Sequence, residues 1–192
     1  LNLIKGGAGG GTRTDGTGGA GGDGIGIKII NSTNNIFHNN SISNVSGGQG
    51  SENGSTDGSD GSAFQLSLVD TDLISIGSTL TNVSVDSSSE LIVKNYLDIL
   101  VKLGTNLVDG ADIEITDNTN VIYATSYYNG TDSKTVNGTI STHLLFDRIY
   151  DGNSTASVNI TVLQVHYGDF NTTINVSMST SHTEVIILET PP

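Results

Sequence analysis

The stretch GIGIKIINSTNNIFHNNSISNV, residues 24–45, decides the fold class of this chain. In its first half, isoleucine alternates with small or polar residues from Ile25 to Ile29, which is the period of a β-strand and not of a helix. In its second half, Ile36 and Ile42 stand between runs of Asn, Ser and Thr. Asn tolerates the left-handed backbone conformation that tight corners require. The stretch therefore predicts short strands that are joined by Asn-rich corners.

The same pattern recurs before and after this stretch. Three pairs of segments align by their apolar positions: residues 24–30 with 63–69, residues 36–46 with 74–84, and residues 1–7 with 42–48. The first two offsets are 39 and 38 residues. Coils of a parallel β-helix repeat in this way, because inward residues stack on those of the next coil. We therefore expect residues 1–85 to form a partial parallel β-helix, with Gly-rich loops at residues 6–24 and 47–62.

The rest of the chain, residues 86–192, reads as separate short strands. Turn dipeptides such as Asp109-Gly110 and Asn137-Gly138 separate seven alternating segments. The seven are residues 96–103, 111–116, 121–126, 139–146, 157–167, 172–178 and 184–189. Seven such strands in about a hundred residues predict a β-sandwich.

Alternation within these segments also predicts the core of the sandwich. The apolar parity shifts between Val162 and Leu163, which predicts a bulge or a change of sheet there. The predicted core consists of Leu97, Ile99, Val101, Ile113, Ile115, Ile122, Ile140, Leu144, Val158, Ile160, Val162, Ile174, Val176, Val185 and Ile187.

Composition restricts the partners of the chain. The net charge is −13 with only seven Lys and Arg, which argues against nucleic acid and against anionic lipid surfaces as partners. The absence of Cys excludes disulfides and thiolate metal sites. No window reaches the roughly 18 apolar residues of a membrane span. The chain has no initiator Met and no leader pattern, and we interpret it as part of a longer product.

Asn-x-Ser/Thr sequons point to an extracellular location. They include 11 of the 19 Asn, about twice the number that the Ser and Thr content would give by chance. They begin at Asn31, Asn39, Asn44, Asn53, Asn82, Asn129, Asn137, Asn153, Asn159, Asn171 and Asn175. We expect N-linked glycans at these sites. The alternative is that Asn, Ser and Thr simply crowd the corners and outward faces of a β-helix.

The Gly-rich loops suggest calcium as the one candidate cofactor. Residues 18–26, GGAGGDGIG, match one copy of the calcium-binding nonapeptide GGxGxDxUx. Carboxylate oxygens suit calcium, and the candidate ligands are Asp15, Asp23, Asp57 and Asp60. The alternative is a solvated Gly-rich loop with incidental acids and no cofactor.

Two segments resemble known families. The segment NSTNNIFHNNSISN resembles the right-handed parallel β-helix repeats of pectate-lyase-like and NosD-like surface proteins, particularly Gly-rich ones encoded by archaea. The segment YLDILVKLGTNLVDGADIEITDNTNVIYATSYYNGTDSKTVNGTIS resembles Ig-like carboxypeptidase-regulatory or bacterial Ig-like modules. The two resemblances imply an all-β chain, in which a short right-handed parallel β-helix is followed by a seven-stranded Ig-like β-sandwich. Such modules serve mainly as spacers, adhesins and shell components.

Catalysis is not expected. Pectate-lyase-like β-helices often cleave acidic polysaccharides with calcium-holding Asp residues and a basic residue, but the only Lys and Arg in residues 1–85 are Lys5, Arg13 and Lys28. A polysaccharide lyase is therefore the least expected function. The four histidines, His38, His143, His166 and His182, have no ligand spacing, and no GxSxG or HExxH motif is present.

We therefore expect an extracellular structural protein at the cell surface. About two and a half coils would leave an open strand edge at the N-terminal end, which a neighbouring copy could cover in a head-to-tail contact. Repetition of that contact would build a filament or a lattice such as an S-layer. The alternative is a glycan-binding adhesin that uses the solenoid loops and Tyr127-Tyr128. For the two tyrosines, a contact with the sandwich is the simpler interpretation.

Overall fold

The computed structural model describes residues 2–5, 24–38, 40–43, 64–74 and 83–188. This part of the chain is built from β-strands, with one 3-10 turn at Ser126–Tyr128, so the all-β prediction is confirmed. By its internal contacts the chain divides into two compact units. The first unit comprises residues 1–92 and 149–157, and the second comprises residues 93–148 and 158–192. The expected domain boundary after residue 85 stays a prediction.

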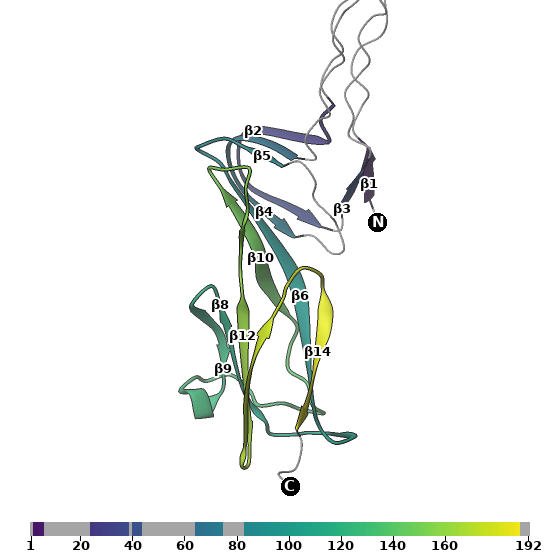
Figure 1. Ribbon diagram of the computed structural model, residues 1–192, viewed down its shortest axis with the longest axis vertical. Coiled ribbons are helices and arrows are strands. Elements are labelled where there is room, and N and C mark those ends of the chain that lie inside the picture. The colour runs from purple at the N-terminus through teal and green to yellow at the C-terminus, as the bar shows by residue number, and fades with distance from the viewer. Residues whose placement is uncertain (1, 6–23, 39, 44–63, 75–82, 189–192) are drawn as a thin grey trace, which may run out of the picture. The chain divides into compact units, whose positions relative to one another are not determined.

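The first unit contains five described strands of its own and part of three others. Its own strands are β1 (Asn2–Lys5), β2 (Ile27–His38), β3 (Asn40–Ser43), β4 (Phe64–Ile74) and β5 (Ser84–Val85). The three others are β6 (Glu90–Leu103), β10 (His143–Asp151) and β11 (Ser157–Val158). The strand order is β11-β10-β6-β4-β2, in which β10, β6, β4 and β2 are labelled in Figure 1. β4 pairs in parallel with β2 and with β5, and β1 pairs in parallel with β3.

The parallel pairing of β2 with β4 corrects the predicted register. Ile27 lies opposite Phe64, an offset of 37 residues, where the sequence alignment predicted 39. A shift of two residues keeps every side chain on the same face, so alternation by itself cannot separate these two registers. In the pair of β1 and β3, Ile4 lies opposite Ile42 and not opposite Val45 as the alignment predicted.

The second unit consists of two sheets. One is antiparallel with the order β13-β12-β8-β9, formed by β8 (Asp112–Asp117), β9 (Asn120–Ala124), β12 (Thr161–Tyr167) and β13 (Phe170–Val176). In the other, β6 pairs in parallel with β14 (His182–Leu188) and antiparallel with β7 (Asn106–Leu107). Each of the seven segments predicted as strands overlaps one of β6, β8, β9, β10, β12, β13 and β14.

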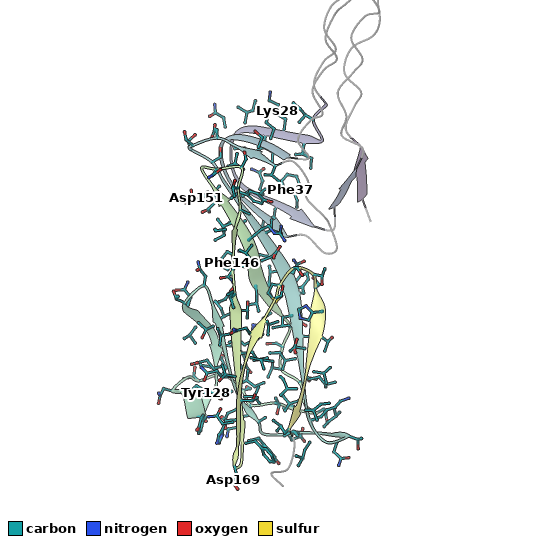
Figure 2. All side chains as sticks on the ribbon, in the orientation of Figure 1. Lys28, Phe37, Tyr128, Phe146, Asp151 and Asp169 are labelled. Atoms are coloured by element: carbon teal, nitrogen blue, oxygen red, sulfur yellow. The ribbon has the colours of Figure 1, made fainter. Side chains whose placement is uncertain are left out.

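Apolar side chains of both sheets form one core in the second unit (Figure 2). Leu97 and Ile99 come from β6, Ile113 and Ile115 from β8, and Leu163 from β12, and each is at most 1% exposed. These positions alternate along their strands, as expected for sheets that pack face to face. Burial of these side chains is the main favourable term that holds the two sheets together.

Several predicted core positions are wrong by one residue. Ile122, Leu144, Val162, Val185 and Ile187 are exposed or half-buried, and the buried residue is in each case the next one along the chain: Tyr123, Leu145, Leu163, Ile186 and Leu188. Each of these strands has two neighbouring apolar residues that compete for the inward position. A shift of one residue exchanges the two faces of a strand, so alternation alone left the choice open.

Val158 and Ile160 are also wrong as core residues, since they are 71% and 60% exposed. The chain leaves β11 at Val158 and enters β12, which belongs to the other sheet, at Thr161. The bulge or change of sheet that was predicted between Val162 and Leu163 is wrong, because β12 continues through both residues in unbroken register with β8 and β13. The change of sheet lies ahead of β12.

Candidate functional site

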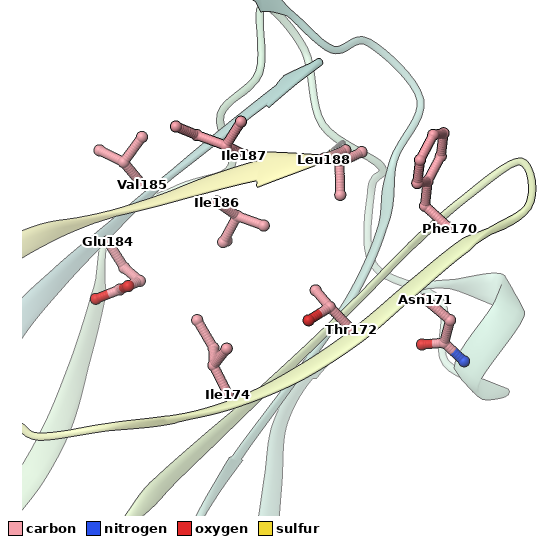
Figure 3. Close-up of a pocket in the computed structure, with 9 residues that line it drawn as sticks. All are labelled: Phe170, Asn171, Thr172, Ile174, Glu184, Val185, Ile186, Ile187 and Leu188. Carbon is pink, nitrogen blue, oxygen red and sulfur yellow. The ribbon is translucent and has the colours of Figure 1, made fainter. Parts of the chain in front are cut away.

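A groove with a volume of about 410 Å³ lies between strands β13 and β14. Thr172 and Ile174 of β13 face Glu184 and Ile186 of β14 across it, and Leu188 lies farther along β14 (Figure 3). Each of the two sheets of the second unit contributes one wall. We call this feature the β13/β14 groove.

Both strands that border the groove are sheet edges within the described part of the chain. β13 is the last strand of its sheet, and β14 pairs only with β6. The outer edge of each strand therefore presents backbone N–H and C=O groups that no described strand pairs. Edges of this kind are templates for the addition of a strand from another chain.

Strand β14 is apolar on both of its faces. Ile186 and Leu188 point toward the groove and are nearly buried, whereas Val185 and Ile187 point to the opposite side, where they are 45% and 58% exposed (Figure 3). Sequence reasoning placed Val185 and Ile187 in the core and so missed this exposed surface. The signal available in the sequence was the unbroken apolar run Val-Ile-Ile-Leu. Its residues point alternately to the two faces of the strand, and a sheet in a two-layer sandwich buries only one face, so two of the four must be exposed. Exposed apolar residues gathered on one strand mark interaction sites.

A second cluster surrounds Asp112 at the start of β8. Its carboxylate accepts hydrogen bonds from the Thr125 hydroxyl and from Lys134 Nζ, each at 2.8 Å, and from the Tyr127 N–H at 3.4 Å. Burial by itself would raise the pKa of Asp112, but the hydrogen bonds and the Lys134 charge outweigh burial and lower the pKa. The Asp112 carboxylate therefore stays charged and anchors the turn that carries Tyr127 and Tyr128.

The two tyrosines pack against neighbouring rings beside this carboxylate. Tyr127 is half exposed and stacks on His166, with ring centroids 3.6 Å apart and planes 8° from parallel. Tyr128 meets Tyr127 edge to face at 5.0 Å. Burial, with smaller contributions from the neighbouring Tyr127 and acidic side chains, raises the pKa of Tyr128 to about 12. The buried atoms Tyr128 Oη and His166 Nδ1 have no hydrogen-bond partner among the described residues.

The described histidines lie at separate places in the second unit. His143 meets Tyr123 edge to face at 4.9 Å, and His182 Nε2 lies 3.6 Å from a carboxylate oxygen of Glu184. His166 stacks on Tyr127, and its Nδ1 is 3.9 Å from Asp112, beyond hydrogen-bond distance. The side chain of His38 lies outside the described part of the chain.

The four calcium candidates, Asp15, Asp23, Asp57 and Asp60, lie outside the described residues, as does the rest of the two Gly-rich loops apart from Gly24. Within the described ranges, no three His, Asp or Glu side chains are grouped so that they could hold a metal ion. No helix in those ranges has the length and apolar character needed to cross a membrane.

Seven of the predicted glycosylation sites lie in the described part of the chain. Six of them have exposed side chains: Asn31, Asn129, Asn137, Asn153, Asn171 and Asn175. Three of these six, Asn31, Asn129 and Asn137, adopt positive φ of 52°, 64° and 50°, the left-handed conformation expected of Asn at corners. The other four predicted sites, Asn39, Asn44, Asn53 and Asn82, lie outside the described residues.

Asn159 differs from the exposed sequons because its side-chain nitrogen is engaged. Nδ2 donates hydrogen bonds to the Asp117 carboxylate and to the Phe146 carbonyl oxygen. Asparagine glycosylation attaches the sugar to this same nitrogen. In the folded chain, the hydrogen bonds and a glycan at Asn159 therefore compete for one atom.

No family model matches this chain, and no curated protein and no solved structure is significantly similar to it. The class of protein that the geometry defines is therefore an all-β chain whose second unit carries a partly apolar groove between two strand edges that no described strand pairs.

Proposed function

We propose that the chain is an extracellular structural protein, a subunit that assembles head to tail with its own copies into a cell-surface filament or lattice. In this proposal the first unit is a short right-handed parallel β-helix and the second is an Ig-like β-sandwich. The parallel pairs formed by β4 with β2 and by β1 with β3 support the β-helix. The two sheets with a shared core support the sandwich.

The observation that carries the proposal is the β13/β14 groove. Two strand edges that no described strand pairs lie on either side of apolar side chains, and Val185 and Ile187 extend the apolar surface to the outer face. A strand from another chain could satisfy the backbone groups and cover these side chains in one step. The net charge of −13 opposes non-specific association of copies, so contact is favoured only where the surface is locally apolar or cationic.

The surface of the chain also fits an extracellular location. Six exposed sequons lie in the described ranges, and two of them, Asn171 and Asn175, stand on the face of β13 that points away from the core. Glycans on that face would leave the strand edge as the accessible part of β13. A filament or lattice built through edges could then carry its sugars on the sheet faces.

Assembly of the purified chain tests this proposal. Light scattering at increasing protein concentration, with electron microscopy of the same samples, should reveal elongated or planar assemblies above a threshold concentration. The double variant Val185→Lys/Ile187→Lys adds charges to the edge strand and should prevent assembly, because lysines on an edge strand block strand addition. Val136→Lys is the matched control at a loop residue that is 64% exposed, and it should assemble normally. A wild-type chain that stays monomeric at every concentration would contradict the proposal.

A glycan-binding adhesin is the second candidate. The half-exposed ring of Tyr127 favours it, because a sugar can stack on an aromatic ring. Binding to a glycan array that is lost in Tyr127→Ala and unchanged in Val185→Lys/Ile187→Lys would support the adhesin over the assembly subunit.

A further inference from the structure

A strand that binds in the β13/β14 groove must carry a defined pattern of side chains. On β14, Glu184 and Ile186 are two residues apart and point to the same side, into the groove (Figure 3). A strand that pairs with the outer edge of β14 must therefore present a group that complements a carboxylate and, two residues further on, an apolar group. Because side chains two residues apart share a face and lie about 6.6 Å apart, this spacing can be sought in other edge strands of the chain.

Strand β2 of the first unit has this pattern. It is the last strand in the order β11-β10-β6-β4-β2, so its outer edge is not paired by any strand in the described ranges. Ile29 is buried, whereas Lys28, labelled in Figure 2, and Ile30 are exposed, and Ile30 has 53% of its surface accessible. Lys28 and Ile30 are thus a cation and an apolar residue, two positions apart, with exposed side chains on the same face of β2.

We propose that the β13/β14 groove receives strand β2 of a second copy of this chain. This inference rests on the proposed assembly function and names its contact. With β2 parallel to β14, Lys28 lies opposite Glu184 and Ile30 lies opposite Ile186. No antiparallel register forms both pairs, because Lys28 opposite Glu184 would place Ile30 opposite His182, and Ile30 opposite Ile186 would place Lys28 opposite Leu188. The charge pattern therefore selects the parallel orientation, which is also the way β14 pairs with β6.

Charge attraction, apolar burial and backbone hydrogen bonds all favour this contact between copies. The chain has only seven cationic residues for 20 acidic ones, so two copies repel each other at most relative placements. Placing Lys28 beside Glu184 replaces that repulsion by attraction at the contact. Ile30 loses its exposure to water against Ile174 and Ile186, and the edges of β2 and β14 exchange backbone hydrogen bonds. The contact joins two different surfaces, so each copy retains a free donor edge or a free groove and the chain of copies can grow.

Cross-linking between single-cysteine variants tests the contact directly, because the chain has no cysteine of its own. Full-length Lys28→Cys and Glu184→Cys are mixed under assembly conditions and oxidised, and we expect a disulfide-linked heterodimer. Lys28→Cys mixed with Val136→Cys is the matched control, since Val136 is exposed but lies outside the groove. A heterodimer of similar yield in the control would overturn the inference, and so would homodimers of Glu184→Cys as the main product, which indicate a symmetric contact.

A charge exchange gives a second, independent readout. Lys28→Glu and Glu184→Lys should each raise the threshold concentration for assembly, roughly two- to fivefold for an ion pair that is partly exposed. The double variant Lys28→Glu/Glu184→Lys restores the pair in the neighbouring copy and should return the threshold to the wild-type value. Net charge alone would predict that Glu184→Lys assembles more readily, because the chain becomes less acidic. That result would overturn the inference.

Different results would overturn the contact of β2 with the groove and the assembly of the chain as such. Assembly that persists without the cross-link between positions 28 and 184, or that is unaffected by the charge exchange, overturns the β2 contact and leaves the assembly function standing. A wild-type chain that never assembles overturns both.

Discussion

The side-chain amide of Asn159 donates hydrogen bonds to the Asp117 carboxylate and, at 3.2 Å, to the Phe146 carbonyl oxygen. The Phe146 N–H in turn donates to the second oxygen of Asp117 at 2.9 Å. Asp117 belongs to β8 and Phe146 to β10, so these bonds connect the two sheets of the second unit. Asp117 is 1% exposed, and burial, which outweighs its hydrogen bonds, raises its pKa. Such a buried carboxylate depends on every donor it has.

The first prediction is that Asn159→Ala destabilises the chain. Removal of the amide leaves the buried Asp117 with one donor fewer, and the loss should be about 1–3 kcal/mol in the free energy of unfolding. Asn175→Ala, at an exposed position of β13, should change it by less than about 0.5 kcal/mol. Urea denaturation of the unglycosylated chains measures both values. Equal effects of the two substitutions would mean that the hydrogen bonds of Asn159 contribute nothing.

The second prediction concerns which sequons carry glycans. We expect sugars at the exposed Asn129, Asn137 and Asn153 and none at Asn159, because its Nδ2 is engaged in hydrogen bonds. Mapping of glycopeptides from native material, together with the intact mass, gives the occupancy of each site. An intact mass equal to the bare 19.9 kDa chain would contradict glycosylation, and a fully occupied Asn159 would contradict the selection by hydrogen bonding.

The third prediction is a dependence of stability on pH through Asp112. Its pKa is lowered in the folded state below the ordinary value of 3.8, so the unfolded state binds more protons between the two values. The stabilisation of the folded state by the charged Asp112 carboxylate is therefore complete above pH 3.8, and it is lost as the pH falls through the pKa of Asp112 in the folded state. We expect Asp112→Asn to cost about 1–2 kcal/mol at pH 7 and the difference from wild type to shrink in this acid window.

Thermal unfolding of the wild-type chain and of Asp112→Asn from pH 7 to pH 2.5 gives the difference in their stability as a function of pH. Asp169→Asn, in the exposed turn before β13, controls for the loss of one negative charge. A difference between Asp112→Asn and wild type that stays constant down to the lowest pH would exclude the proposed role of the carboxylate.

The fourth prediction concerns the backbone that follows Tyr128. A Cβ added at Gly130 would come within 1.9 Å of the Ala124 carbonyl oxygen, so Gly130→Ala must move the backbone. A Cβ at Gly104 would meet no atom within 4 Å, and Gly104→Ala carries only the strain of φ +60°. We expect Gly104→Ala to cost about 1–2 kcal/mol and Gly130→Ala to cost more. Melting temperatures of the two variants decide the order, and the reverse order would refute the close contact.

The fifth prediction is that calcium stabilises the chain if the acids of the Gly-rich loops, Asp15, Asp23, Asp57 and Asp60, form its site. A metal that binds only the folded state at 100 times its dissociation constant adds about 2.7 kcal/mol. Melting curves with calcium, with magnesium and with a chelator test this, with Asp23→Asn/Asp57→Asn as the variant that should lose the response. An identical curve in chelator would leave the four acids as solvated loop residues.

Part of the fold could be predicted from particular residues. Alternation located β6 and β8 and assigned Leu97, Ile99, Ile113 and Ile115 to the core, and all four are buried. Alternation failed where two apolar residues adjoin, as at Val185 and Ile186, because either residue can then face inward. The β13/β14 groove was missed for this reason, since the exposed residue of that pair had been placed in the core.

The Asp112 cluster was missed for a different reason. Asp112, Thr125 and Lys134 are ordinary polar residues of a strand and of loops, and no local pattern marks them as partners. Their hydrogen bonds join positions 13 and 22 residues apart. Only the paths of the intervening strands bring these side chains together.

By itself the sequence determined that the described part of the chain is all-β and roughly where the strands of the second unit lie, because a period of two is a property of neighbouring residues. It did not determine the strand ends, since β6 begins at Glu90 and not at Tyr96. Only the tertiary structure decided which strand edges no described strand pairs and which polar groups are buried. β14 reaches β6 across a separation of 85 residues, His182 opposite Leu97, and Asn159 reaches Asp117 across 42. Pairings at such distances are selected by the packing of the whole core, which no local pattern encodes.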